Sequence, residues 1–208
     1  LSKHLKIDSH SFFKHFCELV DYDNKSTYES TWTHYKQRIR EKHNHYIKTA
    51  PYSDLKVFEQ VLKVIPDFSE VQFSNSAIIR YSQLFEMNST ITVFCNRGTS
   101  GIDGCTSTAC GIALMSASKC NVLITGDVSF FYDSNALWSN HLPSNLRIIL
   151  INNGGGGIFK IIPGPDSTAQ SETFFEAKHE FKAEYICKAF GVHYTRVQTV
   201  QEIESEME

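Results

Sequence analysis

The chain has 208 residues, a net charge of −3 and 41% hydrophobic residues, which is typical of a soluble globular domain with a smaller appendage. This balance of charge gives no indication of nucleic-acid binding. No apolar run approaches the roughly 18 residues of a membrane span. The polar start of the chain also lacks the apolar core of an export signal, so we expect a cytoplasmic location.

The cysteines and histidines do not predict a metal centre of their own. The six cysteines form no CxxC pair, and most lie among apolar or small residues. This setting favours reduced cysteines packed as small hydrophobes. The nine histidines are scattered and none pairs with Cys or Glu at metal-ligand spacing, so we interpret them as surface or partly packed residues.

The first part of the chain, residues 1–48, is polar, aromatic and charged. Residues 31–48 predict a surface helix whose Trp32 and Tyr35 need another domain to cover them. A second helix opens after Pro51 and stops at Pro66. It has an apolar face, which is predicted by the helical spacing of Leu55, Phe58, Leu62 and Ile65.

From there the pattern alternates between strands and helices. This alternation predicts an α/β fold with a doubly wound parallel sheet. The chain ends inside a predicted helix, so we expect it to be a fragment of a larger protein. The strands are expected at 71–74, 91–96, 121–125, 147–151 and 192–197, and the helices at 77–85, 103–118, 133–139, 181–190 and 200–207.

The turn after the first strand contains Ser74-Asn75-Ser76, followed by Arg80 one turn into the next helix. Hydroxyl and amide groups at a helix N-terminus are suited to an anion. Arg80 lies four positions after Ser76 and projects from the same face. The alternative is a plain helix cap beside a surface arginine.

The turn after the second strand is richer in glycine. It reads Asn96-Arg97-Gly98-Thr99-Ser100-Gly101-Ile102-Asp103-Gly104. Arg97 is suited to a bidentate pair with a carboxylate, and Ile102 is an apolar residue placed to wedge against a ring. A glycine-rich turn with incidental side chains is the competing interpretation.

The third turn pairs Gly126-Asp127-Val128-Ser129 with Asn152-Asn153, which is followed by the glycines 154–157. The carboxyl ends of parallel strands meet at one sheet edge, where such folds bind ligands. A carboxylate, an amide oxygen and a glycine carbonyl are hard ligands that suit Mg²⁺. The side-chain-free glycine run also lets backbone approach a ligand closely. The alternative is an ordinary strand-end turn with a flexible loop.

These motifs together resemble the thiamin-diphosphate enzymes. They are most similar to the family of 2-succinyl-5-enolpyruvyl-6-hydroxy-3-cyclohexene-1-carboxylate (SEPHCHC) synthases of the menaquinone pathway. The resemblance covers about residues 50–208 and includes the Asn-Ser-x-x-x-Arg turn, with Ser76 and Arg80. It implies that residues 1–48 are the tail of a central domain with its connector. Residues 49–208 would be a diphosphate-binding domain truncated at its C-terminus, and the pyrimidine-binding domain would be absent.

The resemblance also implies residue roles. Asp127, Asn153 and the Gly155 carbonyl would bind Mg²⁺ or Mn²⁺ against the diphosphate, and Ser76, Arg80 and Arg97 would bind the carboxylate substrates 2-oxoglutarate and isochorismate. The cofactor itself would contact Asn75, Ser76, Ile102, Gly126, Asp127, Val128, Ser129, Asn153, Ile158, Phe159 and Ile162.

The resemblance implies no catalytic residue in this chain. The activating glutamate would lie in the absent domain of a partner subunit, in a homodimer or homotetramer with a shared active site. The isolated fragment is therefore expected to be inactive. Val128, Thr99 and Gly154 depart from the residues most common in the family, but none of them supplies the metal carboxylate.

Three other interpretations remain. Another thiamin-diphosphate carboligase or decarboxylase, such as an acetolactate-synthase-like enzyme, would share the metal motif. A non-catalytic cofactor-binding module would share the fold. A dinucleotide-binding Rossmann domain is disfavoured because no GxGxxG follows the first strand.

Overall fold

The computed structural model describes residues 2–20 and 26–207, and the chain divides into two compact units, Leu1–Thr49 and Ala50–Glu208. The first unit contains α1 (Ser9–Leu19) and α2 (Tyr28–Thr49). The Asp8 side chain caps α1 by accepting a hydrogen bond from Ser11 N at 2.9 Å. Trp32 and Tyr35 of α2 are exposed, as the sequence predicted for a surface helix.

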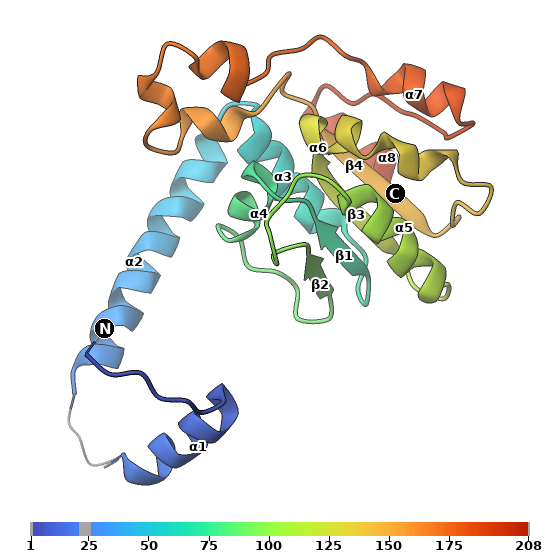
Figure 1. Cartoon of the computed structure of the whole chain (residues 1–208). Coiled ribbons are helices and arrows are strands. Elements are labelled where there is room, and N and C mark those ends of the chain that lie inside the picture. Colours follow the sequence, from blue (N-terminus) through green and yellow to red (C-terminus); the bar gives the residue numbers. More distant parts are fainter. Residues whose placement is uncertain (1, 21–25, 208) are drawn as a thin grey trace. The chain divides into compact units, whose positions relative to one another are not determined.

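The second unit is built on a parallel sheet of four strands in the order β2-β1-β3-β4. Figure 1 shows this sheet between helices. This arrangement confirms the predicted parallel α/β fold. The strands are β1 (Glu70–Phe73), β2 (Thr92–Cys95), β3 (Asn121–Gly126) and β4 (Leu146–Ile151).

Helices connect these strands and cover the sheet. They are α3 (Asp54–Val64), α4 (Ala77–Ser82), α5 (Cys105–Met115), α6 (Asp127–Tyr132), α7 (Ala183–Ala189) and α8 (Val200–Met207). Shorter turns of 3-10 helix are η1 (Ser134–Trp138), η2 (Gly157–Lys160) and η3 (Pro165–Ser167), and η4 (Ser171–Phe175) is a turn of π-helix. No helix in the described part of the chain is long and apolar enough to cross a membrane.

Two clusters of buried side chains lie on opposite faces of the sheet, because successive residues of a strand point to opposite sides. Ile149 and Ile151 of β4 pack into the cluster that contains Phe58 of α3 and Ile203 of α8. Ile148 and Leu150 of the same strand pack against the cluster of α6, η1 and α7. Both faces of β4 are therefore covered, which explains the apolar run from Ile148 to Ile151.

The predicted fifth strand at 192–197 is wrong. The segment has no strand pairing in the structure, and most of its side chains are exposed. Val192 packs against the cluster of α6 and α7, whereas Val197 packs against the cluster of α3 and α8. These two are the partly buried side chains of the segment, and the four between them are exposed, so burial does not alternate. A strand also needs a neighbouring ladder to satisfy its backbone. The described sheet ends at β4 on this side.

The segment 133–139, predicted as a helix, forms a 3-10 turn, η1, because the α-helix of this connection begins earlier, at Asp127, as α6. The helix α1 was not predicted.

Candidate functional site

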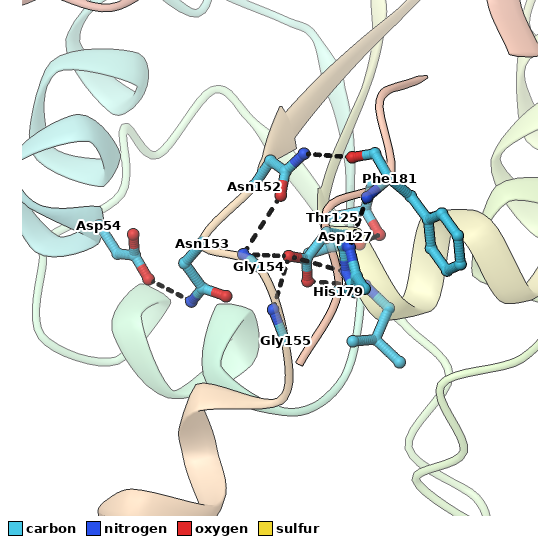
Figure 2. A network of polar contacts seen from close by, with 11 residues as sticks. Asp54, Thr125, Asp127, Asn152, Asn153, Gly154, Gly155, His179 and Phe181 are labelled. Carbon is cyan, nitrogen blue, oxygen red and sulfur yellow. Dashed lines mark hydrogen bonds and ion pairs between the residues drawn. The ribbon is translucent and has the colours of Figure 1, made fainter. Parts of the chain in front are cut away.

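Asp127 lies at the carboxyl end of β3 and is the first residue of α6, with only 2% of its surface exposed. Its Oδ1 accepts a hydrogen bond from Val128 N at 2.7 Å. Its Oδ2 accepts two, from Gly154 N at 2.7 Å and Gly155 N at 3.0 Å. The two halves of the predicted motif therefore meet at one carboxylate, as Figure 2 shows.

The bare backbone of the glycine turn is closely approached by another stretch of backbone. A later segment of the same chain, residues 175–179, lies against it. Gly156 N donates to Glu176 O at 2.6 Å, and His179 N donates to Gly154 O at 3.1 Å. A Cβ atom at Gly155 would lie 2.7 Å from Glu176 O. Glycine is needed here because the chain packs backbone to backbone.

The carboxylate of Glu176 helps to hold this segment. Lys160 Nζ lies 2.6 Å from its Oε1, and Lys178 Nζ lies 3.7 Å from its Oε2. The hydrogen bond from Lys160, and the nearby charge of Lys178, lower the pKa of the Glu176 carboxyl although burial opposes them. The segment is therefore tied to η2 by charge as well as by backbone.

The other two predicted metal ligands flank Asp127. Asn153 Nδ2 donates to Asp54 Oδ2 at 2.7 Å. In Figure 2 that nitrogen points toward Asp54, and the amide oxygen points to the side of Asp127. The Gly155 carbonyl accepts from Gly157 N at 3.0 Å, in an inverse γ-turn centred on Gly156 at φ −79° and ψ 65°.

These atoms fit a hard divalent cation by their chemistry. Asp127 Oδ1 accepts a single hydrogen bond from the described residues, and a carbonyl oxygen such as that of Gly155 has two lone pairs. The Asn153 amide uses its nitrogen on Asp54, which leaves its oxygen for another partner. In the part of the chain that the structure describes, no group of three or more His, Cys, Asp or Glu side chains is placed to bind a metal.

His179 is a neighbour of Asp127 that the sequence did not predict. Its Nε2 lies 3.3 Å from Asp127 Oδ2, and only 9% of its side chain is exposed. We interpreted the histidines as surface or partly packed. No spacing signal marks this one, because it reaches the carboxylate through the fold of residues 175–179 and not through a local motif.

Asn75 organises the first two turns and is only 1% exposed. Its Nδ2 donates to the carbonyls of Asn96 at 2.8 Å and Gly101 at 2.6 Å. Its Oδ1 accepts from Arg97 Nη1 at 2.8 Å. The side chain predicted to contact cofactor thus shapes the glycine-rich turn and directs Arg97.

Ser76 occupies the N-cap position of α4 but makes no capping hydrogen bond through its side chain, so it is not the plain helix cap of the alternative interpretation. Its φ of 69° and ψ of −131° are unfavourable for a residue with a Cβ, which costs about 1–3 kcal/mol. Arg80 lies in the last turn of α4 and is exposed. The half-buried hydroxyl of Ser76 and the exposed guanidinium of Arg80 therefore lie at the turn where the sequence predicted an anion.

The remaining predicted residues lie in the glycine-rich turn, in α6 and its N-cap, and in or just after η2. Ser129 Oγ donates to Ile102 O at 2.5 Å, which ties the glycine-rich turn to α6. Ile158 is 7% exposed, and Phe159 packs on Phe175 with ring centroids 5.5 Å apart. Ile162 is half-buried beyond η2. Val128 N and Gly126 N are already bonded, to Asp127 Oδ1 and Ser74 Oγ respectively.

Comparison with known proteins identifies the family. Residues 75–208 match the thiamine pyrophosphate enzyme family, C-terminal TPP binding domain. The chain belongs to this family. Among solved structures it is similar to benzoylformate decarboxylase from Polynucleobacter necessarius, with a TM-score of 0.57 and 19% identity over 76% of this chain and 31% of that one. It is also similar to 4-hydroxybenzoylformate decarboxylase from Rhodococcus jostii RHA1, with a TM-score of 0.59 and 21% identity over 74% of this chain and 29% of that one. At these identities the structures support the fold alone.

Curated relatives are more similar in sequence. The SEPHCHC synthase of Flavobacterium psychrophilum is 47% identical over 94% of this chain and 35% of its own length. That of Flavobacterium johnsoniae is 44% identical over 100% of this chain and 37% of its own length. The chain thus spans about a third of the curated relatives that it matches.

Proposed function

We propose that the complete protein is a thiamin-diphosphate-dependent transferase, a SEPHCHC synthase, of which this chain is the diphosphate-binding part with its connector. The observation that carries this proposal is the convergence of Gly154 and Gly155 on the Asp127 carboxylate. The 44–47% identity to proteins named as this synthase supports the choice of reaction.

In this proposal Asp127, Asn153 Oδ1 and the Gly155 carbonyl hold Mg²⁺ or Mn²⁺, which binds the diphosphate of the cofactor. When bound, thiamin diphosphate supplies the electron sink for decarboxylation and carbon–carbon bond formation. Ile102 supports the cofactor from the glycine-rich turn. Ile158, with Phe159 and Ile162, excludes water from the apolar side of the site.

The substrates of the proposed reaction are 2-oxoglutarate and isochorismate. Both carry carboxylate groups, which exposed guanidinium groups can bind. Arg97 is oriented by Asn75 Oδ1, and Arg80 projects from α4 after Ser76. Arg80 and Arg97 neutralise the carboxylates of the substrates, and Ser76 helps to orient them. The proton-transfer glutamate comes from a domain outside this chain, on a partner subunit in a homodimer or homotetramer.

The experiment that tests the function measures CO₂ release by the complete protein supplied with thiamin diphosphate, Mg²⁺ and 2-oxoglutarate, with and without isochorismate. We expect strong stimulation by isochorismate, with formation of the coupled product. Release that ignores isochorismate, or that prefers pyruvate, would assign the protein to another thiamin-dependent carboligase or decarboxylase.

The site assignment has its own test in Asp127→Ala. Loss of the only carboxylate in the proposed ligand set is expected to weaken Mg²⁺-dependent cofactor binding by at least about 100-fold, since even outer partners of a metal site are worth 10–100-fold. Calorimetric titration of thiamin diphosphate at several Mg²⁺ concentrations measures this. Unchanged affinity in a folded variant would remove Asp127 from the site.

A further inference from the structure

His179 has no role in the proposed function, yet its ring is packed against the carboxylate at the centre of the site. Its side chain is 9% exposed, and its Nε2 lies 3.3 Å from Asp127 Oδ2. The ring comes from the segment that covers the glycine turn, and Figure 2 shows it beside Asp127. This contact joins two parts of the chain that are far apart in sequence.

The hydrogen bonding of the ring defines which nitrogen carries the proton. Phe181 N donates a hydrogen bond to His179 Nδ1 at 3.2 Å. Nδ1 is therefore an acceptor, and in a neutral imidazole the single N–H must then be on Nε2. The donor of the ring consequently faces the Asp127 carboxylate.

The ring is held in this orientation from several sides. It stacks on Phe181 with centroids 5.2 Å apart and planes 18° apart. It also meets the edge of Phe131 at 5.3 Å and 87°. The backbone of the residue is anchored as well, because His179 N donates to Gly154 O at 3.1 Å.

His179 Nε2 is nevertheless buried without a well-aligned hydrogen-bond partner among the described residues. Leaving a buried donor unpaired is unfavourable. The nearest anionic acceptor is Asp127 Oδ2, which already accepts from Gly154 and Gly155. A small rotation of the ring or carboxylate turns the 3.3 Å contact into a charge-assisted hydrogen bond.

We propose that His179 is a positioning residue for the metal carboxylate. Its Nε2–H holds Oδ2 of Asp127 together with the two glycine N–H groups, so that Oδ1 is presented to the divalent cation. Partners of this kind orient the ligands of many metal sites. The inference rests on the proposed cofactor site, and it assigns to residues 175–179 a part in metal affinity as well as in folding.

The test compares His179→Phe and His179→Gln in the complete protein by calorimetric titration of Mg²⁺ in the presence of thiamin diphosphate. Phenylalanine keeps the aromatic packing but has no donor, whereas the glutamine amide nitrogen reaches about as far as Nε2. We expect His179→Phe to weaken Mg²⁺ affinity about 10–100-fold. His179→Gln is expected to stay within about threefold of the wild type, because the donor is retained.

Phe181→Leu is the matched control. It leaves the Phe181 N–H that directs the tautomer but removes one of the two rings that hold His179, so Mg²⁺ affinity should fall less than in His179→Phe. Equal Mg²⁺ affinity in wild type and folded His179→Phe, or equal loss in the Phe and Gln variants, would overturn the positioning role. If the wild type itself fails to bind thiamin diphosphate with Mg²⁺, the proposed function falls first and this inference with it.

Discussion

At the scale of single residues, the site depends on how each oxygen is shared. Asp127 divides its two oxygens between α6 and the glycine turn. Asn153 has one polar end on Asp54 and the other end unoccupied by the described hydrogen bonds. Asp54 thus fixes the orientation of the Asn153 side chain, because an amide whose nitrogen is held presents its oxygen to the opposite side.

Asp54→Ala should therefore weaken Mg²⁺ affinity about 10-fold, by releasing the Asn153 amide to rotate. Asp54→Asn is the matched control, since its amide oxygen still accepts from Asn153 Nδ2. Mg²⁺ titrations of both variants in the complete protein measure the difference. Because Asp54 also lies in the first turn of α3, thermal melting should accompany the titration. Equal affinity in the two variants would contradict the orienting role.

At the scale of elements, the glycine turn and residues 175–179 form one packed unit. The close approach of two backbones explains why successive glycines follow β4, and why Gly155 has a φ of 154°. A side chain there meets Glu176 O and also imposes a backbone conformation that L residues rarely adopt.

Two substitutions separate these effects. Gly164 has a φ of 112° but nothing within 4 Å of an added Cβ, so Gly164→Ala should cost only the conformational strain of about 1–3 kcal/mol. Gly155→Ala should cost more, because the 2.7 Å contact with Glu176 O must also be relieved. Denaturant unfolding of the two variants compares their free energies. Equal losses would show that backbone packing at Gly155 adds nothing.

At the scale of the whole molecule, the parallel sheet places the three candidate turns at one edge, since parallel strands end on the same side. At the opposite end of β1, Glu70 is buried with 8% exposed. Lys119 Nζ lies 2.7 Å from its Oε1, and hydrogen bonds from Lys119 and Ser116 lower the pKa of the Glu70 carboxyl. Part of the stability of the sheet is therefore dependent on pH.

The direction in which stability changes with pH follows from the lowered pKa of Glu70. The contribution of Glu70 is fully present above its unfolded pKa of about 4.3 and is lost as the pH falls through the lower pKa of the folded state. Glu70→Gln should accordingly flatten the acid side of the stability profile, and the difference from the wild type should shrink as the pH is lowered. Urea unfolding between neutral and acidic pH measures it. A constant difference at every pH would show that the ion pair has no linked proton.

The features that could be predicted from the sequence are those that depend on interactions between residues close together in the chain. Short strand-like segments alternating with helical segments predicted β1 to β4 within a residue at each end, because a parallel sheet with helices on its faces alternates strand and helix along the chain. The same kind of signal predicted a strand at 192–197, where Val192 and Val197 are partly buried but no strand of the described residues pairs with the segment. A local pattern of apolar residues indicates burial, but it does not indicate whether a neighbouring strand is present to form backbone hydrogen bonds.

The sequence by itself determined the fold class, the three strand-end turns and the chemistry of their oxygen and guanidinium groups, since these depend on neighbouring residues and on residue type. Only the tertiary structure decided which partners those groups meet. Asp54 reaches Asn153 across 99 positions, and residues 175–179 bring His179 to Asp127. Such contacts depend on the strand order and on the close packing of bare backbones, which no local spacing encodes.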